Sequence, residues 1–245
     1  SRGLGDVYKR QVERLRGMYA FAIWDTRKKK LFVARDIFGI KPLYYAQMNG
    51  TLMFASEIKA FMEHPKFDKV FNEDALGNYL SFQFVPTNET FFKGVFCLQP
   101  GHYFTYENGE LNITRYFEPN FTGDTEKSFE EIVDDVEAVM KESVAMHKIS
   151  DVEVASYLSS GVDSSYLTYL GQVDRTFTVG FDEGKYSEIQ DAKEFAASIN
   201  MKNDAKVITP EEYWDRLSDI QYYMDEPVAD PAAIAPVSYT HLTLP

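Results

Sequence analysis

One segment constrains the fold more than any other, because it passes from an apolar run through a hydroxyl-rich loop into a second apolar-periodic run. It spans residues 154–170 and reads VASYLSSGVDSSYLTYL. The pattern predicts a strand over 152–158 that ends at Ser159, followed by a helix that begins at Ser164 or Ser165. The first backbone amides of a helix have no partner within it. Together with serine hydroxyls and the positive end of the helix dipole, such amides form a pocket for an anion.

A phosphate group suits this pocket, and two neighbouring residues favour the hypothesis. Gly161 allows the backbone to approach a ligand closely, because glycine has no side chain. Asp163 can bring Mg²⁺ to the same phosphate oxygens. The chain contains neither the Gly-x-x-x-x-Gly-Lys-Ser/Thr nor the Gly-x-Gly-x-x-Gly pattern, so the P-loop and dinucleotide-binding folds have no support. The alternative is an ordinary strand-to-helix turn capped by serine.

Composition narrows the classes of partner and compartment. The 245 residues, 44% of them hydrophobic, suffice for two modest cores, and a net charge of −13 makes nucleic acid a poor partner. Cys97 is the only cysteine, which excludes an internal disulfide and predicts a small buried side chain. No apolar run approaches the roughly 20 residues of a membrane span, and no secretion signal is recognisable. We therefore expect a cytoplasmic protein without a membrane partner.

The first part of the chain has the signals of antiparallel strands and turns. The short apolar runs are 18–24, 31–35, 43–46 and 51–55. Asn49-Gly50 and a second Asn-Gly pair at 108–109 each predict a hairpin. Asn72 is placed to cap a short helix that carries Leu76, Tyr79 and Leu80. These signals favour an antiparallel sheet with helical cover.

Beyond a linker at 118–127, the period becomes helical. Ser128 and Glu131 form a capping-box pair before apolar residues that share one helix face: Phe129, Ile132, Val133, Val136, Val139, Met140 and Val144. A second such pair, Thr209 and Glu212, opens another predicted helix. The expected strand and helix pairs are 152–158 with the helix after Ser164, 176–181 with 187–199, and 205–208 with 210–224. This alternation predicts a parallel sheet with right-handed crossovers.

Ligands of open α/β sheets bind beyond the carboxyl ends of the strands. The loop at 159–165 and the Gly180-Phe181-Asp182 turn are both expected there. Leu158 and Val179 are therefore placed to line an adenine slot.

The loop at 158–165 resembles the Ser-Gly-Gly-x-Asp-Ser pyrophosphate loop of the ATP pyrophosphatases, which adenylate a substrate and release pyrophosphate. It departs from that pattern at Ser160, where the family usually has glycine. Three further stretches resemble glutamine-hydrolysing asparagine synthetases in the order of that family. They are 16–25 with 35–45 and 55–60, then 92–95 with 98–103, and finally 224–232.

The resemblance implies an α+β part over 12–121, the remnant of an αββα N-terminal-nucleophile amidotransferase domain, and a truncated α/β parallel-sheet ATP-pyrophosphatase domain over 122–236. It implies amidation of L-aspartate through a β-aspartyl-AMP intermediate, with ammonia from L-glutamine, with ATP and Mg²⁺ as cofactors, and it allows a homodimer. The residues that it assigns to ATP and pyrophosphate are Leu158, Ser159, Ser160, Gly161, Val162, Asp163, Ser164, Ser165 and Val179. Asp163 is the implied metal ligand.

Residues 1–11 and 237–245 resemble translated adaptor sequence, so we expect non-native ends around an internal fragment. The resemblance implies an amino-terminal cysteine nucleophile, and Ser1 is a poor substitute for it. Later synthetase residues are also missing. We therefore assign no catalytic residue and expect the fragment to be inactive in both half-reactions.

Other acidic and basic residues carry two readings each. Arg35 and Asp36 are candidates for a domain interface, with a structural ion pair as the alternative. Asp225, Glu226 and Asp230 are candidates for Mg²⁺ or substrate binding, with helix termination as the alternative. Two other functions stay open: a β-lactam-synthetase-like or peptide-cyclising ligase of the same architecture, and a non-catalytic nucleotide-binding module.

Overall fold

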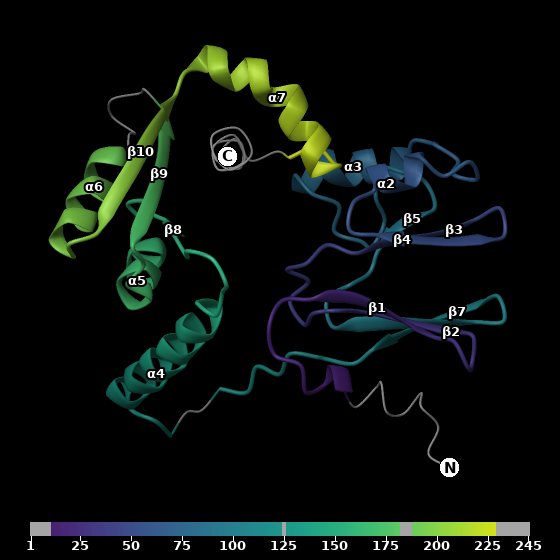
Figure 1. Cartoon of the computed structure of the whole chain (residues 1–245), viewed down its shortest axis with the longest axis horizontal. Coiled ribbons are helices and arrows are strands. Elements are labelled where there is room, and N and C mark those ends of the chain that lie inside the picture. Colours follow the sequence, from purple (N-terminus) through teal and green to yellow (C-terminus); the bar gives the residue numbers. More distant parts are fainter. Residues whose placement is uncertain (1–10, 124–125, 182–187, 229–245) are drawn as a thin grey trace. The chain divides into compact units, whose positions relative to one another are not determined.

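A computed structural model describes residues 11–123, 126–181 and 188–228. The described chain divides into two compact units (Figure 1). Unit 1 takes in the described residues up to Phe121 and a separate segment at 224–228, and unit 2 takes in those between Thr122 and Tyr223. The fold is mixed α/β with several sheets.

Unit 1 is built on two antiparallel sheets. The first has the strand order β1-β2-β6-β7, with β1 at Ala20–Asp25, β2 at Lys30–Arg35, β6 at His102–Glu107 and β7 at Glu110–Arg115. The second has the order β4-β3-β5, with β3 at Tyr44–Met48, β4 at Thr51–Ala55 and β5 at Val95–Cys97. Its helices are α2 at Lys59–Met62 and α3 at Glu73–Phe82, and Figure 1 shows them beside the second sheet.

Two clusters of buried side chains hold these layers together. The cluster between the two sheets consists of Val33, Leu43, Tyr45, Leu98 and Phe104. The cluster between the second sheet and α2 consists of Ala46, Met53, Ile58, Phe61 and Val95. Neighbouring residues of β3 enter different clusters, because successive side chains of a strand point to opposite faces. The second sheet is consequently covered on both sides.

Both predicted Asn-Gly hairpins are confirmed. Asn49 and Gly50 join β3 to β4 with φ angles of 50° and 71°, and Asn108 and Gly109 join β6 to β7 with 52° and 86°. Positive φ at both central residues matches the twist of the flanking strands. The prediction that Asn72 caps a helix is right in position and wrong in detail. Its side chain makes no cap hydrogen bond and instead donates from Nδ2 to the Thr90 carbonyl oxygen at 3.0 Å.

Unit 2 contains a three-stranded parallel sheet of order β10-β9-β8. Its strands are β8 at Ser156–Tyr157, β9 at Arg175–Phe181 and β10 at Lys202–Ile208. The helices that follow Phe121 along the chain are α4 at Phe129–His147, α5 at Val162–Gly171, α6 at Ile189–Ser198 and α7 at Pro210–Met224. Leu158 packs with Ala192 and Ala196, so α6 covers the beginning of the loop after β8.

Both predicted capping boxes are confirmed. Ser128 Oγ accepts from the Glu131 amide at 3.2 Å, and Glu131 Oε2 accepts from the Ser128 amide at 2.8 Å. Thr209 and Glu212 make the same reciprocal pair, with both distances at 3.2 Å. Each box satisfies two amides that a helix start leaves without partners.

The strand boundaries differ from the prediction. The first strand is only two residues long, because its pairing with β9 covers Ser156 and Tyr157 alone. The third begins three residues earlier than expected, at Lys202, where it pairs with Arg175. Gly180 and Phe181 belong to β9 rather than to a turn, and Asp182 lies outside the described residues.

Candidate functional site

The predicted phosphate loop leaves the sheet from a fixed point. The Leu158 amide donates to the Phe177 carbonyl oxygen at 2.8 Å, and Thr178 Oγ1 donates to the Leu158 carbonyl oxygen at 2.8 Å. The Leu158 side chain is 2% exposed. Because its backbone groups and its side chain all have partners within the protein, Leu158 positions the loop, and its contact with an adenine ring stays a prediction.

Two serine hydroxyls fold the loop back on itself. Ser159 Oγ and Ser164 Oγ share a hydrogen bond of 2.8 Å. Ser164 Oγ also accepts from the Ser159 amide at 3.2 Å, and Ser159 Oγ accepts from the Gly161 amide at 3.2 Å. The loop is thus ordered by its own side chains before any ligand arrives.

The helix after the loop begins earlier than predicted. α5 starts at Val162 with Gly161 as its cap residue, and the Ser165 amide donates to the Gly161 carbonyl oxygen at 3.1 Å. The prediction of a start at Ser164 or Ser165 is wrong, because these serines lie within the first turn. Val162, Asp163 and Ser164 occupy the three positions whose amides have no intrahelical acceptor. Their N–H groups have no hydrogen-bond acceptor among the described residues, and binding of an anion by them stays a prediction.

Gly161 has an ordinary backbone conformation, with φ at −71°. A Cβ atom added there would lie 3.3 Å from Ser159 Oγ. The Ser159 hydroxyl therefore borders the space that glycine leaves. Close approach of a ligand at Gly161 stays a prediction.

Glu188 contacts the loop although the sequence did not predict a role for it. The Ser160 amide donates to Glu188 Oε2 at 3.4 Å, and Glu188 is the cap residue of α6. A long hydrogen bond to an exposed carboxylate is weak. No local pattern could have found it, because the two residues are 28 positions apart.

Asp163 is exposed in the first turn of α5, and within the described residues no hydrogen bond or ion pair engages its carboxylate. Mg²⁺ that travels with a phosphate needs only one or two protein carboxylates and keeps several waters. A free carboxylate beside three free amides fits that mode. In the described part of the chain, no group of three or more His, Cys, Asp or Glu side chains could hold a metal by itself.

Val179, the second residue predicted to line an adenine slot, is half-buried in β9.

Arg35 and Asp36 organise a turn of unit 1 without pairing with each other. Arg35 donates to three carbonyl oxygens, of Lys41 at 2.8 Å, Gly39 at 2.6 Å and Leu98 at 2.5 Å. Asp36 is fully buried and accepts from the amides of Tyr19, Phe38, Ile40 and Lys41 at 3.0 to 3.3 Å. Both are structural, but the described structure has no ion pair between them. Their role at a domain interface stays a prediction.

The environment shifts the pKa of two groups around this turn. Burial alone would raise the pKa of Asp36, yet the amide donors, with Lys41 and Ile40 the strongest, hold it below the ordinary value of 3.8. Burial raises the pKa of the Cys97 thiol, and Arg35, whose Nη1 lies 2.9 Å from Sγ, opposes that rise. Cys97 is half-buried rather than fully buried.

Two of the three acidic residues predicted to bind Mg²⁺ or substrate contact the backbone of unit 1. Asp225 and Glu226 accept hydrogen bonds from backbone amides of unit 1. Asp230 lies outside the described residues. None of them is near the loop in sequence, and binding of substrate or metal by them stays a prediction.

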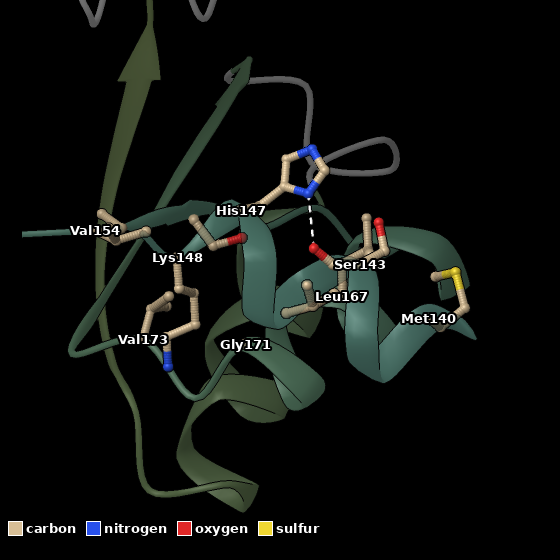
Figure 2. A pocket seen from close by; sticks show the side chains of 11 residues that line it. Met140, Ser143, His147, Lys148, Val154, Leu167, Gly171 and Val173 are labelled. Carbon is tan, nitrogen blue, oxygen red and sulfur yellow. Dashed lines mark hydrogen bonds between the residues drawn. The ribbon is translucent and has the colours of Figure 1, made fainter. Parts of the chain in front are cut away.

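A cavity of about 280 Å³ lies at the other end of α5 from the loop (Figure 2). Its lining is mostly carbon and comprises Met140, Ser143, Val144, His147, Lys148, Val154, Ala155, Ser156, Leu167, Gly171 and Val173. His147 Nδ1 turns to the Ser143 carbonyl oxygen at 2.8 Å, as the dashed line in Figure 2 marks. Because none of the lining residues belongs to the loop at 159–165, the cavity is separate from the phosphate loop.

No described helix is both long enough and apolar enough to cross a membrane.

Asp36→Asn should lower the free energy of unfolding of unit 1 at pH 7 by about 2–3 kcal/mol, since one amide oxygen replaces a charged acceptor of four N–H groups. The pKa of Asp36 is depressed on folding, so its stabilisation is present above 3.8 and is lost as the pH falls through the folded pKa. Urea unfolding of both proteins from pH 7 to pH 3 measures this. A difference that did not shrink at low pH would contradict the assigned role.

Gly171→Ala should raise the free energy of unfolding of unit 2 by about 0.5–1 kcal/mol. An added Cβ would lie 3.6 Å from Val173 Cγ1 and 3.8 Å from Val144 Cγ1, which are ordinary contacts on the cavity wall. Gly77→Ala in α3 is the comparator, because a Cβ there meets nothing within 4 Å and reports helix propensity alone. Loss of stability in Gly171→Ala, measured by urea unfolding, would show that the cavity wall cannot accept a methyl group.

Comparison with known proteins places this chain in a family. The family described as glutamine amidotransferase domain matches residues 4–117, and the family described as asparagine synthase matches residues 135–239. Asparagine synthetase [glutamine-hydrolyzing] 1 of Bacillus subtilis is 41% identical over an alignment of 233 residues that covers 93% of this chain and 37% of that protein.

Two other relatives show the range of the group. A putative asparagine synthetase [glutamine-hydrolyzing] of Mycobacterium bovis is 40% identical over 91% of this chain and 36% of its own length. Amidase chyE of Penicillium rubens is 34% identical over 70% of this chain and 28% of its own length. The chain thus spans little more than a third of the length of the first two relatives. With both domain matches and 41% identity over most of its length, the chain belongs to the glutamine-hydrolysing asparagine synthetase family.

Proposed function

We propose that the protein of which this chain is a part amidates L-aspartate to L-asparagine with ATP, through a β-aspartyl-AMP intermediate. The observation that carries the proposal is the start of α5, where three free amides, two paired serine hydroxyls and the free carboxylate of Asp163 meet at one loop. Membership of the family supports the same reaction.

The chemistry explains why such a loop is needed. A carboxylate is a poor electrophile, so attack by ammonia requires a leaving group on the aspartate side chain. When that carboxylate attacks the α-phosphorus of ATP, the bond to the β,γ-diphosphate breaks and negative charge collects on the departing oxygens. The amides of Val162, Asp163 and Ser164 are fixed donors for that charge. The hydroxyl pair of Ser159 and Ser164 supplies one further O–H donor, because the other proton is used within the pair. Ser160 and Ser165 flank these donors and complete the proposed pyrophosphate site.

Mg²⁺ bound with the nucleotide would neutralise part of the charge on the phosphate oxygens, and Asp163 is the residue proposed to hold it. Of the two residues proposed to line an adenine slot, Val179 has the better support. It is half-buried in β9, whereas the Leu158 side chain already packs on α6. Ammonia then displaces AMP from the acyl carbon and gives the amide.

For unit 1 we propose the corresponding part of an amidotransferase that supplies ammonia from L-glutamine. Two packed antiparallel sheets with helices beside one of them support a remnant of an αββα arrangement. The parallel order β10-β9-β8 with α6 on the loop supports an ATP-pyrophosphatase arrangement for unit 2. The division at Phe121 supports domains over 12–121 and 122–236. A homodimer is part of the same proposal.

One relative favours a second candidate with the same first step. Amidase chyE carries a name that does not mention asparagine. A ligase that adenylates a different carboxylate, or that closes a ring with an internal amine, would use the same loop. The two candidates differ in the acceptor and not in the phosphate chemistry.

Asp163→Asn and Ser164→Ala should each weaken binding of magnesium pyrophosphate to this chain by about tenfold, because each removes one charge-assisted or hydroxyl contact. Isothermal titration calorimetry with magnesium pyrophosphate is the measurement. Asp174→Asn, which removes an exposed carboxylate just beyond α5, is the matched charge control and should bind like the wild type. Equal affinity in all four proteins would contradict the proposed loop.

The longer protein should catalyse exchange of labelled pyrophosphate into ATP only when L-aspartate is present. This dependence follows because the reverse reaction needs the β-aspartyl adenylate. Exchange supported instead by another carboxylate would favour the second candidate. Nucleotide binding without any exchange would leave only a non-catalytic module.

A further inference from the structure

Two neighbouring carboxylates after α7 are held inside unit 1. α7 ends at Met224, and Asp225 has a φ angle of 63°. This left-handed conformation stops a helix, and among residues with a side chain Asp and Asn tolerate it best. The turn directs the segment at 224–228 onto unit 1, to which it belongs as a compact body.

Asp225 closes the amino end of α2. Its Oδ2 accepts from the Ile58 amide at 2.6 Å, and its Oδ1 accepts from the Lys59 amide at 3.4 Å and from Lys59 Nζ at 2.9 Å. The Asp225 side chain is 6% exposed and that of Lys59 is 16% exposed. Ile58, the cap residue of α2, makes no side-chain cap hydrogen bond of its own. The acceptor that a helix start needs therefore comes from a residue 167 positions away.

Glu226 closes a second open amide of unit 1. Its Oε1 accepts from the Phe91 amide at 2.9 Å. The Phe91 carbonyl oxygen in turn accepts from the amide of Asn72, the cap residue of α3, at 2.9 Å. Asp225 and Glu226, here called the acidic clasp, thus hold the start of α2 and the strand-like segment that pairs with the start of α3.

We infer that Asp225 and Glu226 are positioning residues, whose carboxylates serve as backbone acceptors that complete unit 1, rather than ligands of substrate or metal. Three of their four carboxylate oxygens already accept hydrogen bonds from unit 1. Asp225 is also neutralised by Lys59. The inference rests on contacts within unit 1 alone and is independent of the proposed reaction.

The partners of the two carboxylates require different properties of them. The Phe91 amide needs one oxygen acceptor and no charge, so glutamine can replace Glu226. Burial raises the pKa of Glu226, the Phe91 amide opposes the rise, and Asp225 adds to it. Burial thus makes the charged form of Glu226 less favourable than it is in water. Asp225 serves two amides and a cation, so asparagine keeps the left-handed backbone preference but loses the attraction to Lys59.

Amide hydrogen exchange at Ile58, Lys59 and Phe91, resolved by NMR in the whole chain, tests the clasp. Glu226→Ala should speed exchange at Phe91 by about tenfold, while Glu226→Gln should restore the wild-type rate. Asp225→Ala should speed exchange at Ile58 and Lys59 by about tenfold, with Asp225→Asn in between. Glu57→Gln, which removes the other, exposed carboxylate partner of Lys59, is the matched control and should leave all three amides unchanged.

A second experiment distinguishes carboxylates that hold the backbone of unit 1 from carboxylates that bind a ligand. Addition of MgCl₂ or L-aspartate to the wild-type chain should leave exchange at the three amides unchanged, because the carboxylates are already engaged. Faster exchange on addition of either one would show that the carboxylates leave their amides for a ligand, and would overturn the inference. Failure of Glu226→Gln to restore Phe91 would also overturn it, even if the alanine variants did not fold.

Discussion

The pairing of β8 with β9 fixes where the phosphate loop begins, and the proposed chemistry depends on that point. Only two residues of β8 pair, but the hydrogen bonds of Leu158 to Phe177 and Thr178 extend the contact by one residue. The buried Leu158 side chain adds a hydrophobic anchor on α6. From this fixed end, the Ser159 and Ser164 hydroxyls close a small ring, and the amides of the first turn of α5 are left facing outward. A loop without that anchor would have to pay the entropy of ordering its donors when a ligand binds.

Side chains complete the backbone of both units where regular structure stops. Asp36 accepts hydrogen bonds from four amides of a turn, and Arg35 donates to three carbonyl oxygens beside it. The acidic clasp accepts from three amides elsewhere in unit 1. Buried backbone groups without partners cost about 1–3 kcal/mol each, so these few polar side chains determine which turns are tolerated. Side chains that the sequence made candidates for a domain interface or for ligand binding are thereby partners of the backbone.

Sequence patterns predicted what depends on neighbouring residues. Both Asn-Gly hairpins and both capping boxes were found, because their geometry is set within four residues. The predicted start of α5 is two or three residues late, because Ser164 and Ser165 resemble cap residues, whereas the Ser164 hydroxyl is used inside the loop. Asn72 was the correct cap position, but its side chain is used by Thr90, 18 residues away. Contacts such as Ser160 with Glu188 and Ile58 with Asp225 have no local signal, so only the fold could reveal them.

The geometry at Gly161 links two positions of the loop through a single oxygen atom. The φ angle of −71° is open to any amino acid, and among the described residues the Ser159 hydroxyl, 3.3 Å from where a Cβ would stand, is the group that crowds a side chain at this position. Residues 159 and 161 are therefore expected to covary among relatives: a smaller side chain at the first would relieve the demand for glycine at the second. Variation in this loop has to be interpreted in pairs of positions, since a change that is harmful alone becomes neutral when its partner changes first.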